Sequence, residues 1–89
     1  MKIDVTQDDI NEGHRKNGRC CPLSLAIARA FNSPWSVVSG TGYASVILQR
    51  RGEDLVFRLP EEACSFVRIY DLEGPQAVKP ITFDLLPYP

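Results

Sequence analysis

The sequence lacks most of what a metal site, a disulfide scaffold or a membrane anchor requires. It has one histidine, His14, and three cysteines, of which Cys20 and Cys21 are adjacent instead of spaced as zinc ligands are. An odd number of cysteines does not make the even disulfide framework of a small secreted domain. No apolar run approaches the roughly 20 residues of a membrane-spanning helix, and residues 1–9 lack the hydrophobic stretch of a signal peptide. We therefore expect reduced thiols, no metal, no cofactor and a cytoplasmic location.

The chain also lacks an excess of charge of either sign. Its formal net charge is -1, which argues against general electrostatic attachment to nucleic acid or to an anionic membrane. Any affinity for phosphate must therefore be local. The length of 89 residues predicts one domain over residues 1–89, which is too small for a deep substrate cavity and a separate cofactor site. A binding role is favoured over complex catalysis.

Alternating polarity, helix caps and turn residues together predict eight elements. Thr6 followed by Asp9 resembles a capping box, while Pro22 and Pro60 suit the first turns of two further helices. Short connections in the middle of the chain favour antiparallel strands. The predicted elements are a strand over Lys2–Val5, a helix ending at Gly13, a helix from Pro22 to about Phe31, strands over Trp35–Ser39, Tyr43–Arg50 and Asp54–Leu59, a helix from Pro60 to about Leu72, and a strand over Ile81–Leu85.

This order, β-α-α-β-β-β-α-β, predicts an α+β fold. We expect a small antiparallel sheet, made of a three-stranded meander plus the terminal strands, packed against two to three helices. Trp35 is expected to be a core anchor, and Gly40-Thr41-Gly42 a hairpin turn because strand-like sequence follows it. Prolines around the last strand place it at a sheet edge, and the apolar segment Leu85–Pro89 is expected to pack on its own domain. Further core candidates are Ala63, Phe66, Val67 and Tyr70, which share one helical stripe.

One candidate site lies where a basic loop precedes the helix that begins at Pro22. If the loop folds back over the free amides of the first helical turn, its charges would form a cradle for a phosphate, a carboxylate or an acidic protein surface. The alternative, that the loop is simply solvated, is favoured because no phosphate-loop motif is present. The candidate ligand-binding or partner-binding residues are His14, Arg15, Lys16, Arg19, Cys21, Leu23 and Ser24.

Cys21 has a second interpretation. At the N-cap of this helix, the helix dipole and Arg19 would lower the pKa of the thiol and make it nucleophilic. A thiol enzyme also needs a positioned base, and His14 lies in a loop without an obvious orienting carboxylate. Burial of Cys21 as a small apolar residue is therefore favoured, and we assign no catalytic residue.

A group of ordered motifs runs along the chain. They are Ile3-Asp4-Val5-Thr6, Asp9-Ile10, Gly13, Cys21-Pro22-Leu23-Ser24-Leu25-Ala26, Arg58-Leu59-Pro60, Phe66-Val67 and Tyr70-Asp71. With these motifs the chain resembles a group of small proteins encoded by bacteriophages and related mobile elements, over most of its length. The resemblance implies a phage-type accessory role and transfers no catalytic residue. Ser24 stands where that group often has alanine.

Three functional hypotheses follow. The leading one is a non-enzymatic protein that binds and modulates or inhibits a host macromolecule, such as a defence component, in the host cytoplasm. The second is a binding module for a phosphorylated small molecule or a nucleic-acid backbone at the basic loop and helix start. The third is a thiol-dependent enzyme or redox sensor at Cys21. A host protein or protein complex is the expected partner, no membrane is involved, and the chain is either a monomer or a homodimer formed at the edge strand Ile81–Leu85.

Overall fold

The computed structural model describes residues 1–39, 42–48 and 53–88. It confirms the α+β class and the predicted order of elements. Where both can be compared, the bounds differ from the predicted ones by one or two residues at most ends. Gln49 and Arg50, the predicted end of the second strand of the meander, lie outside the described residues, and a short strand after the predicted last one is an addition. The elements are β1 (Lys2–Val5), α1 (Gln7–Glu12), α2 (Pro22–Ala30), β2 (Ser36–Val38), β3 (Tyr43–Leu48), β4 (Glu53–Arg58), α3 (Glu61–Glu73), the 3-10 turn η1 (Pro75–Ala77), β5 (Ile81–Asp84) and β6 (Leu86–Pro87).

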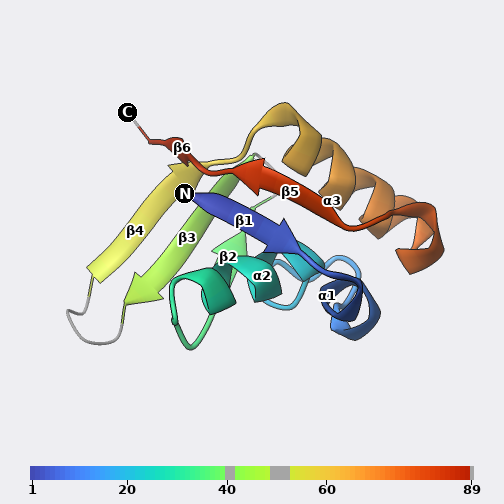
Figure 1. Cartoon of the computed structure of the whole chain (residues 1–89), viewed down its shortest axis with the longest axis horizontal. Helices are drawn as coiled ribbons and strands as arrows, with labels where there is room; N and C mark the ends of the chain where they lie inside the picture. The colour runs from blue at the N-terminus through green and yellow to red at the C-terminus, as the bar shows by residue number, and fades with distance from the viewer. Residues whose placement is uncertain (40–41, 49–52, 89) are drawn as a thin grey trace.

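The strands form two antiparallel sheets instead of one. One has four strands in the order β2-β3-β4-β6, and the other pairs β1 with β5 (Figure 1). The C-terminal segment belongs to both, because Phe83 pairs with Ile3 in one sheet and Leu86 pairs with Arg58 in the other. Pro87 has no N–H to donate, so it suits the last position of the β6 ladder. Strands β1 and β5 therefore form a separate two-stranded ladder, and the short β6 is the strand that extends the β2-β3-β4 meander.

Helix α1 begins at the capping box that the sequence predicts. The Thr6 hydroxyl accepts a hydrogen bond from the Asp9 N–H, and the Asp9 carboxylate accepts one from the Thr6 N–H. Asp9 is buried and forms a two-pronged ion pair with Arg29 of α2, with N–O distances of 2.7 and 2.8 Å. Burial alone would raise the pKa of Asp9, but hydrogen bonds from Arg29 and Thr6 hold that pKa below its ordinary value. The cap thus also ties α1 to α2.

The core lies between α2, the inner face of the four-stranded sheet, and the β1–β5 ladder. Helix α2 presents Leu23, Ala26 and Ile27, all fully buried, and the Ser36 hydroxyl of β2 donates to the Ser24 carbonyl of α2. Helix α3 closes the core on another side, as its apolar stripe predicts. Its buried residues are Ala63, Phe66 and Tyr70, and the partly buried Val67 packs beside them.

Two smaller expectations have different outcomes. The expectation that Trp35 anchors the core is wrong, since this residue is only half-buried and its ring is covered by the Arg19 guanidinium, 4.3 Å from the ring centroid. The apolar C-terminal segment does pack on its own chain, through the β4–β6 pairing and an edge contact between Tyr88 and Tyr43. In the expected turn, Gly40 and Thr41 lie outside the described residues, and Gly42 adopts a left-handed φ of 93°.

Across residues 1–39, 42–48 and 53–88, no helix is both long enough and apolar enough to cross a membrane.

Candidate binding cleft

The loop that precedes α2 is a closed, docked structure. Its ends are joined by a hydrogen bond from the His14 N–H to the Cys20 carbonyl, and the Gly18 carbonyl accepts one from the Val38 N–H of β2. A Cβ at Gly18 would lie 2.4 Å from the Val38 carbonyl oxygen, so this close approach requires glycine. The loop therefore lies along the outer edge of β2 and cannot fold back freely over α2.

Arg15 in this loop caps the far end of α3. Its Nε and Nη2 donate to the Asp71 carbonyl at 3.1 and 2.9 Å, and Nη2 also donates to the Leu72 carbonyl at 2.8 Å. The last carbonyls of a helix lack intrahelical partners, and α3 has no basic residue in its last turn. A guanidinium from a distant part of the chain fills both needs. Arg15 thus has a structural role that no local pattern in the sequence reveals.

The first turn of α2 lies inside the protein. Cys21 is the N-cap residue, as expected, but it is only 2% exposed, and Leu23 and Ser24 are equally buried. The Ser24 hydroxyl donates to the Cys21 carbonyl at 2.9 Å. Burial raises the pKa of the Cys21 thiol despite hydrogen-bond donors at Ser24 and Leu23, so the expected lowering is wrong. Desolvation outweighs the helix dipole here, and burial of Cys21, the favoured alternative, is confirmed.

The seven residues singled out in the sequence are therefore divided between two environments. The Arg19 guanidinium stacks on the Trp35 ring, and the Arg15 guanidinium donates hydrogen bonds to α3. The structure does not gather the charged side chains and the amides of Leu23 and Ser24 into one open cradle. Four of the seven lie exposed on the loop, namely His14, Arg15, Lys16 and Arg19, whereas Cys21, Leu23 and Ser24 are buried.

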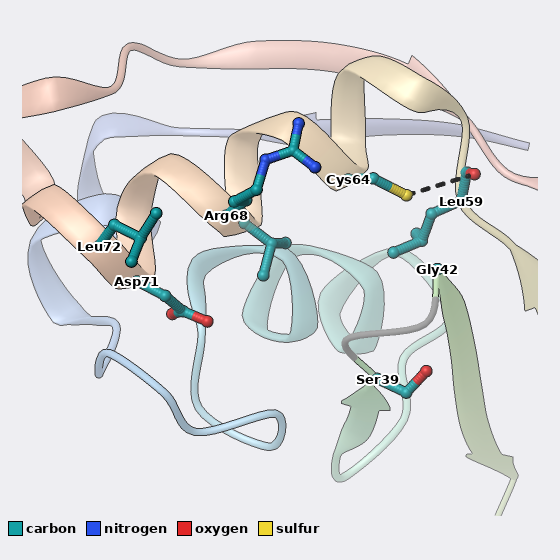
Figure 2. Close-up of a pocket in the computed structure, with 8 residues that line it drawn as sticks. Ser39, Gly42, Leu59, Cys64, Arg68, Asp71 and Leu72 are labelled. Atoms are coloured by element: carbon teal, nitrogen blue, oxygen red, sulfur yellow. Dashed lines mark hydrogen bonds between the residues drawn. The ribbon is translucent and has the colours of Figure 1, made fainter.

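A different site lies beside α3. A cleft of about 320 Å³ opens between this helix, the start of β3 and the connection from β4 to α3 (Figure 2). Its apolar wall is made by Leu59, Val67 and Leu72, with the Cys64 sulfur at one end. Figure 2 shows the Cys64 side chain directed toward Leu59, whose carbonyl accepts a weak hydrogen bond from the thiol at 3.8 Å. The polar lining residues are Ser39, Arg68 and Asp71, and Gly42 completes the set.

Helical geometry explains which side chains of α3 face this cleft. The stripe at Ala63, Phe66 and Tyr70 is buried in the core. Cys64 and Val67 belong to the stripe one residue further on, and successive residues of an α-helix are rotated by about 100°, so this stripe lies at the border of the core. The sequence places these residues on one helical face, but it does not reveal that Ser39 and Gly42 lie opposite. For that reason the cleft was missed.

A smaller cavity of about 160 Å³ adjoins the cleft. It shares Val67 and Asp71 with the cleft and is lined on its other side by the loop residues Lys16, Asn17 and Gly18. The Asp71 carboxylate stands at the junction and accepts a hydrogen bond from the Lys16 N–H at 2.9 Å. The basic loop therefore does border a potential site, but on the α3 side. Lys16 and Cys21 are the residues of the predicted set that line this smaller cavity.

Within the described parts of the chain, no group of three or more His, Cys, Asp or Glu residues is arranged to hold a metal ion. The cleft offers apolar side chains, one thiol, one carboxylate and one cationic side chain, an arrangement suited to holding part of another molecule. Comparisons with protein-family models, with curated proteins and with solved structures find no match for this chain.

Proposed function

We propose that this chain is a small non-enzymatic accessory protein that binds a host protein or protein complex through the α3 cleft and so modulates or inhibits it. A phage-type role in the host cytoplasm, which the motif resemblance implies, belongs to this proposal. The observation that carries it is the cleft itself, which is lined by the apolar side chains of Leu59, Val67 and Leu72. Apolar surface in a concave site is what anchors a partner side chain.

Leu72 is the cleft residue that we expect to contribute most to the binding of a partner. It is a large apolar side chain near the end of α3, and it is 68% exposed. A single exposed leucine is ordinary on a protein surface, but this one lines a cleft that Leu59 and Val67 also line. Burying a leucine side chain fully contributes about 1.5–3 kcal/mol, so a partner that covers Leu72 gains substantial affinity.

The two other hypotheses have less support. A phosphate site at the start of α2 needs open amides, but Leu23 and Ser24 are buried and Arg15 already donates to α3. A reactive thiol at Cys21 needs a lowered pKa and access to reagents, whereas burial raises that pKa. Protein binding at the α3 cleft requires neither condition, and we favour it for that reason.

A comparison of two variants of α3 tests the proposal. Leu72→Gln removes apolar surface from the cleft, and Ile69→Gln is the matched control, because Ile69 is also exposed on α3 but does not line the cleft. Native pull-downs from a bacterial host lysate identify bound proteins, and each one is then purified and titrated against the wild type and both variants. We expect the wild type and Ile69→Gln to bind one partner equally, and Leu72→Gln to bind it about 10-fold more weakly. Recovery of no partner, or equal binding by Leu72→Gln, contradicts the proposal.

A further inference from the structure

The rim of the α3 cleft carries more positive than negative charge. Lys16 borders the smaller cavity and Arg68 borders the main cleft, while Asp71 is the carboxylate that both cavities share. Within residues 1–39, 42–48 and 53–88, the one ion pair joins Arg29 to Asp9, so neither Lys16 nor Arg68 is neutralised by a carboxylate. Both side chains are exposed and can reach an approaching molecule.

The carboxylate at the rim is already engaged. One Asp71 oxygen accepts the Lys16 N–H at 2.9 Å, and the backbone carbonyl of the same residue accepts two hydrogen bonds from the Arg15 guanidinium. These donors place a positive charge next to Asp71 and reduce the repulsion that it exerts on an incoming anion. The Arg15 guanidinium therefore offsets part of the negative charge of Asp71 at this end of the cleft.

The main cleft is lined by a cation of its own, Arg68. The Arg68 guanidinium donates to the Ser65 hydroxyl at 3.3 Å, a weak bond to a neutral group. In Figure 2 the Arg68 side chain extends along α3 on the Cys64 side, whereas Asp71 points the opposite way, toward the loop. The apolar residues of the cleft thus have one exposed cation beside them, Arg68, and a second exposed cation, Lys16, borders the adjoining smaller cavity.

We propose that the partner inserts a peptide segment in which an apolar side chain is flanked by aspartate or glutamate. The apolar side chain packs against Leu59, Val67 and Leu72, and the carboxylate pairs with Lys16 or Arg68. A peptide is favoured over a single-stranded nucleic acid because no aromatic ring lines the described cleft, and base stacking on aromatic rings is the usual anchor for single strands. This inference rests on the proposed function, since it specifies what the same cleft recognises.

The test uses the full chain and a displayed library of short random peptides. The wild type is screened first, and enriched peptides are counter-screened against Leu72→Gln, so that only peptides that need the cleft remain. We expect these peptides to share an apolar residue next to Asp or Glu. Their affinities, measured by fluorescence polarisation, are expected to fall about two- to five-fold when that acid is replaced by its amide, and to become insensitive to that change near 1 M salt.

Charge-reversed variants complete the test. The double variant Lys16→Glu with Arg68→Glu is expected to lose the acidic peptides and to enrich basic ones, while Lys79→Glu, an exposed change outside the cleft, is expected to behave like the wild type. Circular dichroism confirms that each variant is folded. Cleft-dependent peptides without an acidic preference, or displacement of the peptides by a single-stranded oligonucleotide, would overturn this inference and leave the proposed function standing. An absence of peptides that depend on Leu72 counts against the proposed function itself.

Discussion

Replacing Arg15 by methionine tests whether the basic loop holds the end of α3. Methionine keeps a long unbranched chain and removes every donor, so three hydrogen bonds to the Asp71 and Leu72 carbonyls are lost. A hydrogen bond to a charged group contributes about 1.5–3 kcal/mol, and a cation near a helix C-terminus adds about 0.3–1 kcal/mol. Arg15 is exposed, so water competes for these bonds. We therefore expect a net loss of about 1–2 kcal/mol in the free energy of unfolding.

Urea denaturation followed by circular dichroism measures this loss. The midpoint is expected to fall with an unchanged m-value, and the melting temperature is expected to fall by about 4–8 °C for each kcal/mol. Arg15→Lys keeps the charge but not the planar fork, so it is expected to lose about half as much stability. Lys79→Met is the control, because it removes an exposed cation that has no hydrogen bond to α3 among the described residues. If Arg15→Met and Lys79→Met have the same free energy of unfolding, the reasoning is refuted. The loop would then be a solvated connection that does not stabilise α3.

Three further predictions concern other parts of the fold. Because the folded-state pKa of Asp9 is lowered, this residue stabilises the fold above the unfolded value of 3.8 and loses that effect as pH falls through the folded value. Asp9→Asn is therefore expected to cost about 1–3 kcal/mol at pH 7 and to flatten the loss of stability below pH 4, as acid titrations of urea midpoints measure. Gly18→Ala forces a Cβ toward the Val38 carbonyl and is expected to cost about 2 kcal/mol or more, seen as a lower melting temperature and faster amide exchange at Val38. Alkylation of Cys21 by iodoacetamide at neutral pH is expected to be slower than that of an unperturbed thiol, as mass spectrometry of digests would measure, and rapid labelling would contradict its burial.

Local signals in the sequence predicted the elements well because their causes are local. The Thr6–Asp9 cap involves residues three positions apart, and Pro22 at the first turn of α2 reflects only the geometry of that turn. The buried stripe of α3 follows from helical spacing in the same way. These features need no knowledge of what lies across the fold.

The division into two sheets and the position of the cleft could not be predicted from local signals in the sequence. The pairing of β5 with β1 and of β6 with β4 depends on the path of the C-terminal segment across the core. The prolines around this segment indicate that it lies at the edge of a sheet, but they do not show which strand it pairs with. The density of charge before α2 suggested contacts with the start of α2, whereas the structure shows contacts between this loop and α3. Arg15 and Lys16 contact α3, a helix far away in the sequence, and the buried helix start became visible only with the tertiary structure.

The pairing of β1 with β5 also governs the order in which the chain can fold during synthesis. Strand β1 is translated before β5, the strand that satisfies its backbone groups, and three α-helices and three strands lie between the two in the described chain. Until then Ile3 and Val5 cannot be shielded by β5, and the β1 edge remains open to other strands. A fragment that ends before Ile81 would therefore expose the unpaired backbone edge of β1, which can pair with strands of other chains. We expect such fragments to aggregate or to be degraded rapidly in cells.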